Sequence, residues 1–256
     1  IHLKGEPITM TDRYESRRMM GSDMFERWQA TETDQRKGVP HPLVQKPAPE
    51  GALLIDLPAP ETFNFDGVSV LEAIRSRRSR REYLPQPLTL SELAFLCWAA
   101  QGVRQADSNE VRLMRTVPSA GARHPFETYL AVLRVEGLEV GLYRYLGIEH
   151  KLCRLEADPE IGEKWARFCA PFARGSAVSF AWTALPYRTE WRYAYASPKL
   201  VMQDSGHVSQ NLYLACEAIG CGTCAVSAYA QHGMDALLGL DGETEFTVYC
   251  APVGKV

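Results

Sequence analysis

The stretch Arg75–Arg81 reads Arg-Ser-Arg-Arg-Ser-Arg-Arg and combines five guanidinium groups with two hydroxyl groups. Guanidinium groups match phosphate oxygens with paired hydrogen bonds, and a serine hydroxyl adds a neutral donor. Arg77 and Arg81 are four residues apart, so on a continuing helix they would share one face. The stretch therefore predicts an anion site. The alternatives are a solvated helix end, where cations oppose the helix dipole, and a nucleic-acid contact.

A second candidate is Gly220–Ala225, which fits the pattern G-x-G-x-x-A. A dinucleotide fold needs this pattern after a strand and before a helix. Here the order is inverted, because the pattern follows the longest expected helix and precedes an extended segment. We expect the glycines to end that helix and to let the backbone approach a flat ligand closely. Cys221 and Cys224 lie where a helix dipole opposes thiolate formation, so we expect structural thiols and no metal site.

The elements that must position these residues alternate irregularly between helices and strands, which predicts the α+β class. Ser69–Glu72 and Thr89–Glu92 have the capping-box pattern that begins a helix. Apolar residues at helical spacing follow both boxes, and Gly102 is expected to end the second helix. A long helix is predicted over 201–219, with Gly220 after its end. Buried strands are expected over 127–135, 141–145, 177–183 and 244–251.

Residues 1–66 differ from the rest because they are rich in proline, arginine and glutamate. One helix is plausible over 14–29. The proline-rich run 39–49 favours extended backbone and excludes a helix. We interpret the domain organisation as an N-terminal extended arm over 1–66 and one cofactor-binding domain over 67–256. The alternative for the arm is a floppy tail.

The overall composition is that of a globular protein, with 46% hydrophobic and 23% charged residues. The net charge of −3 gives no field that would attract nucleic acid or an anionic membrane. No apolar run reaches the length of a membrane-spanning helix. Seven cysteines without regular spacing suit reduced thiols in a core. We therefore expect a cytoplasmic protein that binds neither nucleic acid nor membrane.

Together these pieces resemble the nitroreductase superfamily. The resemblance rests on Arg77-Arg78-Ser79-Arg80-Arg81, on the loop 118–126 (Pro-Ser-Ala-Gly-Ala-Arg-His-Pro-Phe), on the helix and Gly-x-Gly turn within 206–229, and on Gly254-Lys255. It implies a sandwich in which helices flank a central, mainly antiparallel sheet, and an intertwined homodimer with FMN at its interface.

The resemblance also implies a role for each matched residue. Arg77, Ser79 and Lys255 would hold the FMN phosphate, and Arg78 would lie beside the ribityl chain. Arg81 would lie near the flavin N1/O2 edge, where a cation raises the reduction potential. Backbone N–H groups of Val226, Ser227 and Ala228 would face the flavin N5. Pro118, Ser119, Ala120 and Gly121 would come from the opposite subunit and pack flat against the ring.

Finer features resemble the branch of azoline dehydrogenases that mature thiazole- and oxazole-containing peptides. These features are the loop 118–129, the strand 141–145 and the run 204–211 (Asp-Ser-Gly-His-Val-Ser-Gln-Asn). That branch often carries Trp-Lys-Tyr, whereas this chain reads Trp191-Arg192-Tyr193. Lysine can lose its proton and act as a base, but arginine effectively cannot. Tyr193 is therefore the better candidate for proton transfer, and Arg192 could instead hold an anionic substrate.

The resemblance implies ping-pong hydride transfer through FMN, with a thiazoline or oxazoline ring of a modified peptide as the donor. Tyr193 would remove the ring proton, with His207 as a second candidate. Three alternatives stay open: an NAD(P)H-dependent reductase of nitroaromatics or quinones, a flavin- or peptide-binding subunit without turnover, and a nucleic-acid-binding module. A cyclodehydratase is a possible partner.

Overall fold

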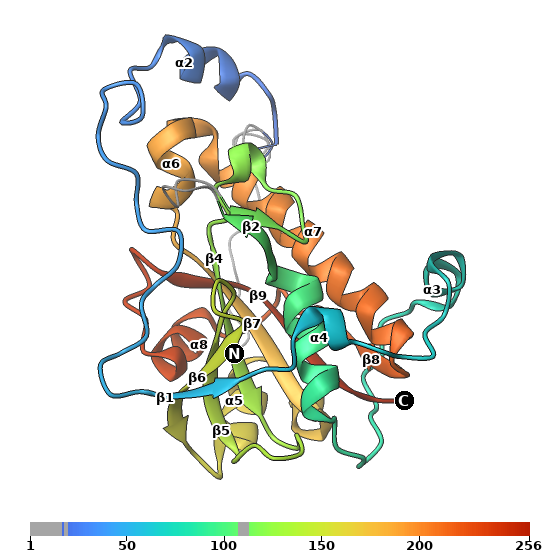
Figure 1. The fold of residues 1–256 in the computed structure, drawn as a ribbon. Coiled ribbons are helices and arrows are strands. Elements are labelled where there is room, and N and C mark those ends of the chain that lie inside the picture. Colours follow the sequence, from blue (N-terminus) through green and yellow to red (C-terminus); the bar gives the residue numbers. More distant parts are fainter. Residues whose placement is uncertain (1–16, 18–19, 107–112) are drawn as a thin grey trace, which may run out of the picture.

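The computed structural model of the protein describes residue 17, residues 20–106 and residues 113–256 (Figure 1). A seven-stranded sheet forms its centre, in the order β1-β6-β5-β4-β7-β9-β8. Every neighbouring pair of strands in this sheet is antiparallel. The strands are β1 (Leu53–Asp56), β4 (Phe126–Val132), β5 (Gly141–Leu146), β6 (Lys151–Ala157), β7 (Val178–Ala184), β8 (Cys221–Thr223) and β9 (Phe246–Lys255).

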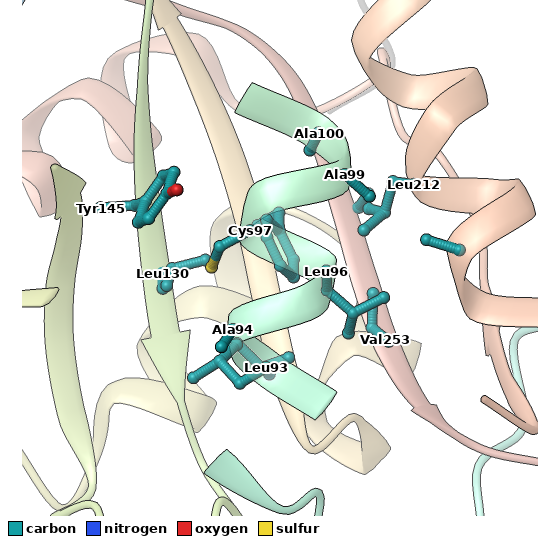
Figure 2. Close-up of a cluster of buried hydrophobic side chains, with 14 of the residues drawn as sticks. Leu93, Ala94, Leu96, Cys97, Ala99, Ala100, Leu130, Tyr145, Leu212 and Val253 are labelled. Atoms are coloured by element: carbon teal, nitrogen blue, oxygen red, sulfur yellow. The ribbon is translucent and has the colours of Figure 1, made fainter. Parts of the chain in front are cut away.

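One face of the sheet is covered by α4 (Leu90–Gln101) and α7 (Ser197–Ala218). Strand residues alternate between the two faces, so Leu130 points to this side and Tyr129 to the other. The predicted helical stripe of α4 is fully buried here, as Figure 2 shows for Leu93, Leu96 and Cys97 against the strands. Truncating a leucine such as Leu96 to alanine would cost about 2–5 kcal/mol at such a site.

The opposite face is covered by α5 (Ile161–Phe168) and α8 (Gln231–Leu238). Trp165 of α5 and Met234 of α8 are fully buried there against Ala131 and Ala181 of the central strands. Small residues on this face of β4 and β7 leave room for the large indole ring. The sheet is therefore sandwiched between two helical layers, which confirms the predicted α+β fold class.

Local signals in the sequence explain where the main helices begin and end. The Thr89–Glu92 box is complete, because Thr89 Oγ1 accepts from the Glu92 N–H and the Glu92 carboxylate accepts from the Thr89 N–H. At Ser69 only the first of these two bonds forms, and α3 (Val70–Ser76) follows it. Gly220 lies just beyond α7 with a φ of 64°, the left-handed conformation expected after a helix.

The described part of the N-terminal region runs along one side of the molecule from α2 (Met24–Ala30) to the edge strand β1 (Figure 1). Its proline-rich run is held by buried partners: Arg144 donates to the Pro47 carbonyl at 2.6 Å, and Glu127 accepts from the Lys46 N–H at 2.8 Å. Of the expected helix over 14–29, Arg17 is helical, residues 20–23 form a turn, and α2 then runs from Met24 to Ala30; residues 14–16 and 18–19 lie outside the described residues. The boundary near residue 66 stays a prediction.

A small hairpin and a short helix complete the surroundings of the site. The hairpin joins β2 (Val103–Ala106) to β3 (Leu113–Arg115). α6 (Tyr187–Tyr193) follows β7 and leads through the turn 194–196 into α7. Among the described residues, none of the helices combines the length and apolar character needed to cross a bilayer.

Candidate active site

The arginine-rich run does not continue the helix that precedes it. α3 ends at Ser76, and Arg77 already has an extended ψ of 125°. Ser79 then pairs with Thr223 in a parallel bridge, and the Arg80 N–H donates to the Thr223 carbonyl at 2.9 Å. The prediction that Arg77 and Arg81 share a helix face is therefore wrong, because pairing with β8 draws this segment into extended backbone.

In extended backbone, alternate residues face the same way, so Arg77 and Ser79 point to one side. Both reach Tyr213 of α7: the Arg77 guanidinium lies 5.2 Å from the ring centroid, and Ser79 Oγ is 2.9 Å from the phenol oxygen. The same phenol accepts the N–H of Ala225 at 2.9 Å. Tyr213 thus joins the arginine-rich run to the segment that precedes Val226, and no signal in the sequence had singled it out.

The arginines of this group lack carboxylate partners in the described part of the chain. Arg77, Arg78 and Arg81 form no ion pair there, although Arg81 lies 5.9 Å from the ring centroid of Phe172. Because uncompensated guanidinium groups repel one another, the presence of several of them within one short segment favours a bound anion. The donor set of guanidinium groups and a serine hydroxyl fits a phosphate.

Two residues predicted for this group are engaged elsewhere. The Val226 N–H donates to the Cys250 carbonyl at 2.7 Å. Ser227 and Ala228 are exposed residues, and their N–H groups have no hydrogen-bond partner in the described part of the chain. Lys255 Nζ is paired with the Glu92 carboxylate and donates to the Ile219 carbonyl at 3.0 Å. An arriving phosphate would have to compete with Glu92 for this ammonium group.

The second group gathers around the loop Pro118–Ala122 at the other end of α7. Asp204 of α7 is 3% exposed, and its carboxylate accepts from Ser119 Oγ at 2.6 Å and from the Ala120 N–H at 3.3 Å. Burial raises the pKa of the Asp204 carboxyl above its ordinary value, and the bond from Ser119 opposes that shift. Ser119 Oγ in turn accepts from the His124 N–H at 2.9 Å.

Backbone strain is concentrated in this loop. Gly121, Ala122 and His124 have φ values of 59°, 53° and 45°, a conformation that side chains with a Cβ adopt at a cost. His124 is 4% exposed, and burial together with the nearby Arg115 guanidinium lowers the pKa of its imidazole to about 3. The ring is therefore neutral at physiological pH. Because the surrounding contacts hold this strained backbone in one conformation, the loop is preorganised to receive a ligand.

The two predicted catalytic residues lie against this loop. A Cβ on Gly121 would be 2.6 Å from the Tyr193 hydroxyl and 3.2 Å from Arg192 Cδ, so the glycine allows Tyr193 to approach the backbone. The Arg192 guanidinium lies 5.4 Å from the Tyr193 ring centroid. Both side chains are partly exposed at the end of α6. The structure thus brings Pro118–Gly121, Arg192 and Tyr193 together in one chain.

The two groups are separate within one chain. Asp204 belongs to the second group and Tyr213 to the first. The two residues are nine positions apart in α7, which places them roughly 13 Å apart along the helix axis.

The pattern at Gly220–Ala225 belongs to the group around Tyr213. It leads into β8, whose Gly222 would meet Arg80 Cγ at 2.5 Å if it carried a Cβ. This confirms the inverted order relative to a dinucleotide fold, whereas the close approach at Gly222 is to the Arg80 side chain, and the approach to a flat ligand stays a prediction.

Both cysteines of this turn are buried, which agrees with the expectation of structural thiols. All seven cysteines are free and buried. Burial raises the pKa of the Cys221 thiol to about 12, so it stays protonated at neutral pH. Among the residues that the structure describes, no three His, Cys, Asp or Glu side chains are grouped in a way that could hold a metal ion.

Comparison with known proteins places this geometry in a family. The model of the nitroreductase family matches residues 74–255. A protein of Methanocaldococcus jannaschii that carries the name nitroreductase is 34% identical over 194 residues, which is 75% of this chain and 93% of that protein. The trifolitoxin-processing protein TfxB of Rhizobium leguminosarum bv. trifolii is 32% identical over 135 residues, which is 50% of this chain but 36% of that protein.

A solved structure is similar in fold over a comparable share of the chain. It is that of the Escherichia coli microcin synthetase complex McbBCD with truncated pro-MccB17 bound. One of its chains superimposes with a TM-score of 0.59 at 17% identity, covering 77% of this chain and 76% of that one. The family model covers more than half of the chain, and the M. jannaschii relative is matched over most of its own length. The chain belongs to the nitroreductase family of oxidoreductases.

Proposed function

We propose that the protein is an FMN-dependent dehydrogenase that oxidises azoline rings in modified peptides. The observation that carries the proposal is the division of the site into two groups at opposite ends of α7. The first gathers cations that suit a phosphate, and the second offers Tyr193 and Arg192 beside a rigid, small-residue loop. Such a division suits a long, flat cofactor whose phosphate binds to the first group of one copy of the chain while its ring packs against the loop of a second copy.

A second copy of the chain would complete the site. The first group of one chain would then face the loop Pro118–Gly121 of the other, which is the arrangement of an intertwined homodimer. The apolar side chains on α3 support this proposal, because Val70, Leu71 and Ile74 are 71%, 58% and 58% exposed. Such a face on a helix that projects from the body (Figure 1) favours burial against a partner.

The residues of the first group would hold and orient FMN. Arg77 and Ser79 would bind the phosphate, with Arg78 beside the ribityl chain, and Lys255 would contribute if it leaves Glu92. The unpaired N–H groups of Ser227 and Ala228 would point to the flavin N5, and Arg81 would face the N1/O2 edge. Bound FMN supplies a two-electron acceptor that takes a hydride.

The second group would act on the substrate. Oxidation of an azoline ring to an azole removes one hydride and one proton. Tyr193, as its phenolate, would take the proton and become a neutral phenol, because it is the group at this end of α6 whose oxygen lies next to the Gly121 backbone. Arg192 would hold an anionic group of the substrate. The electrons would leave in a second half-reaction to an acceptor such as molecular oxygen, which gives ping-pong kinetics.

The names of the relatives support a role in peptide maturation. TfxB is named for trifolitoxin processing, and the McbBCD neighbour is a microcin synthetase solved with truncated pro-MccB17 bound. By analogy, a cyclodehydratase would supply the azoline substrate of this chain. The M. jannaschii relative, named a nitroreductase, supports a second candidate: an NAD(P)H-dependent reductase of nitroaromatics or quinones.

The choice of electron donor separates these candidates. The FMN-loaded protein is mixed anaerobically with a thiazoline-containing peptide, with NADH or with NADPH, and bleaching of the flavin absorption is followed. The proposal predicts bleaching by the peptide, together with loss of two hydrogen atoms from it by mass spectrometry. Bleaching by NADH or NADPH alone would replace the proposal with the reductase. Flavin that no donor bleaches would indicate a binding subunit without turnover.

A further inference from the structure

The end of α6 is capped by the N-terminal region rather than by its own side chains. A helix leaves its last carbonyl groups without intrahelical donors. Here the Gln35 N–H donates to the Trp191 carbonyl at 2.9 Å, and Trp28 Nε1 donates to the Arg192 carbonyl at 2.6 Å. These carbonyls belong to the two residues that precede Tyr193. The N-terminal region therefore fixes the peptide units from which Arg192 and Tyr193 project.

Trp28 also contacts Tyr193 directly. The two ring centroids are 5.5 Å apart with an interplanar angle of 40°, a distance at which aromatic pairs attract. Arg36 in turn stabilises the position of Trp28. Its guanidinium lies 5.1 Å from the indole and donates to the carbonyls of Trp28 and Thr31 at 3.1 and 2.6 Å. The indole is thus held between Arg36 and the Tyr193 side of α6.

In return, α6 holds the N-terminal region through three side chains. Trp191 Nε1 donates to the Val39 carbonyl at 2.8 Å, and Arg188 Nε donates to the Leu43 carbonyl at 2.8 Å. The Tyr187 hydroxyl donates to Asp34 at 3.0 Å. With the two capping bonds, these contacts join residues 28–43 to α6 along its whole length. We call residues 28–43 the strap.

The backbone just after Tyr193 needs such a restraint. Ala194 has a φ of 42° and a ψ of −118°, which is strained for a residue with a Cβ. Strain of this kind persists only where the surrounding contacts fix the chain. The strap supplies those contacts on one side of α6, and the loop around Gly121 packs against Tyr193 on the other.

We propose that the strap is a built-in part of the active site and that Trp28 is a positioning residue for Tyr193 and Arg192. The strap lies outside the matched family region, which begins at residue 74. The inference rests on the proposed function, because it assigns proton transfer to Tyr193. Without the indole donor, the end of α6 loosens and Tyr193 leaves its productive position, while the FMN phosphate site at the other end of α7 stays intact.

The first test needs neither cofactor nor substrate. Trp28→Phe keeps an aromatic ring and removes the N–H donor. Gln45→Ala is the matched control, because Gln45 holds the same region to Glu149 and Ile148, away from α6. Hydrogen exchange of segment 187–196 should become roughly two- to tenfold faster in Trp28→Phe and stay unchanged in Gln45→Ala. Unchanged exchange in both variants would overturn the proposal.

The second test asks whether Trp28 acts through Tyr193. With a thiazoline-containing peptide, Trp28→Phe should lower kcat roughly ten- to hundredfold with little change in KM. In a Tyr193→Phe background the same substitution should have no further effect. Independent, multiplicative losses would contradict a positioning role. If the unmodified protein does not oxidise the peptide, the proposed function fails, whereas the exchange experiment still decides whether the strap holds α6.

Discussion

Gly121→Ala tests the packing of Tyr193 against its loop. Gly121 has φ and ψ of 59° and 22°, and an alanine there costs about 1–2 kcal/mol because of its left-handed conformation. The new Cβ would also lie 2.6 Å from the Tyr193 hydroxyl. Ordinary contact begins near 3.4 Å, so the hydroxyl must retreat by about 0.8 Å. A misplacement of about 1 Å can cost roughly a hundredfold in rate.

Gly239→Ala is a control with nearly the same backbone. Gly239 has φ and ψ of 68° and 36°, and a Cβ at this position would meet open space, with no described atom beyond its chain neighbours within 4 Å. Both variants should lose about 1–2 kcal/mol in chemical denaturation. Peptide oxidation should fall roughly ten- to hundredfold in Gly121→Ala and stay near the unsubstituted level in Gly239→Ala. Equal activities in the two variants would refute the reasoning.

Other contacts give three more expected outcomes. Glu127→Gln leaves the buried Arg188 without its ionic partner and should cost about 3–5 kcal/mol in urea denaturation; a loss below about 1 kcal/mol would contradict the pairing. Arg77→Ala should weaken FMN binding roughly ten- to hundredfold in a fluorescence titration, whereas Arg167→Ala on the far face should not. Because the folded-state pKa of His124 is depressed to about 3, the unfolded chain binds the extra proton below about pH 6.5. Stability should therefore fall as the pH drops from 6.5, by at most about 1.4 kcal/mol per pH unit, and His124→Asn should flatten that slope.

Elements with local signals could be predicted from the sequence. The complete capping box at Thr89, the end of α4 at Gly102 and the long helix before Gly220 all depend on interactions within one turn of helix. The strands β4, β5 and β7 are buried on both faces and contain the apolar residues that such burial requires. Their residue types alone sufficed to identify them.

Elements that depend on distant partners were missed. β6 carries charged residues at its solvated end and is a strand because β5 and β1 pair with it. α6 begins without a side-chain cap from the described residues and is held by the strap, more than 140 residues earlier in the chain. The helical interpretation of Arg77–Arg81 failed for the same reason, because its extended form comes from pairing with Thr223.

The same distinction between local signals and distant partners applies to the residues of the site. Residue types indicated the arginine-rich run, whereas the small-residue loop and the pair Arg192-Tyr193 came from the resemblance to the family. Their organising partners could not be identified from the sequence. Asp204, Tyr213 and Trp28 act through contacts with residues 85, 134 and 164 positions away. A single sequence does not show which residues so far apart in the chain are in contact in the fold.

The absorption spectrum of the purified protein tests the central claim most directly. The protein is isolated, or incubated with FMN and desalted, and the chromophore released by heat is identified and quantified against the chain. We predict flavin absorption bands and FMN equimolar with the chain, with marked loss in Arg77→Ala. A colourless protein that takes up no FMN would contradict the assignment and leave the arginine-rich run to another anion.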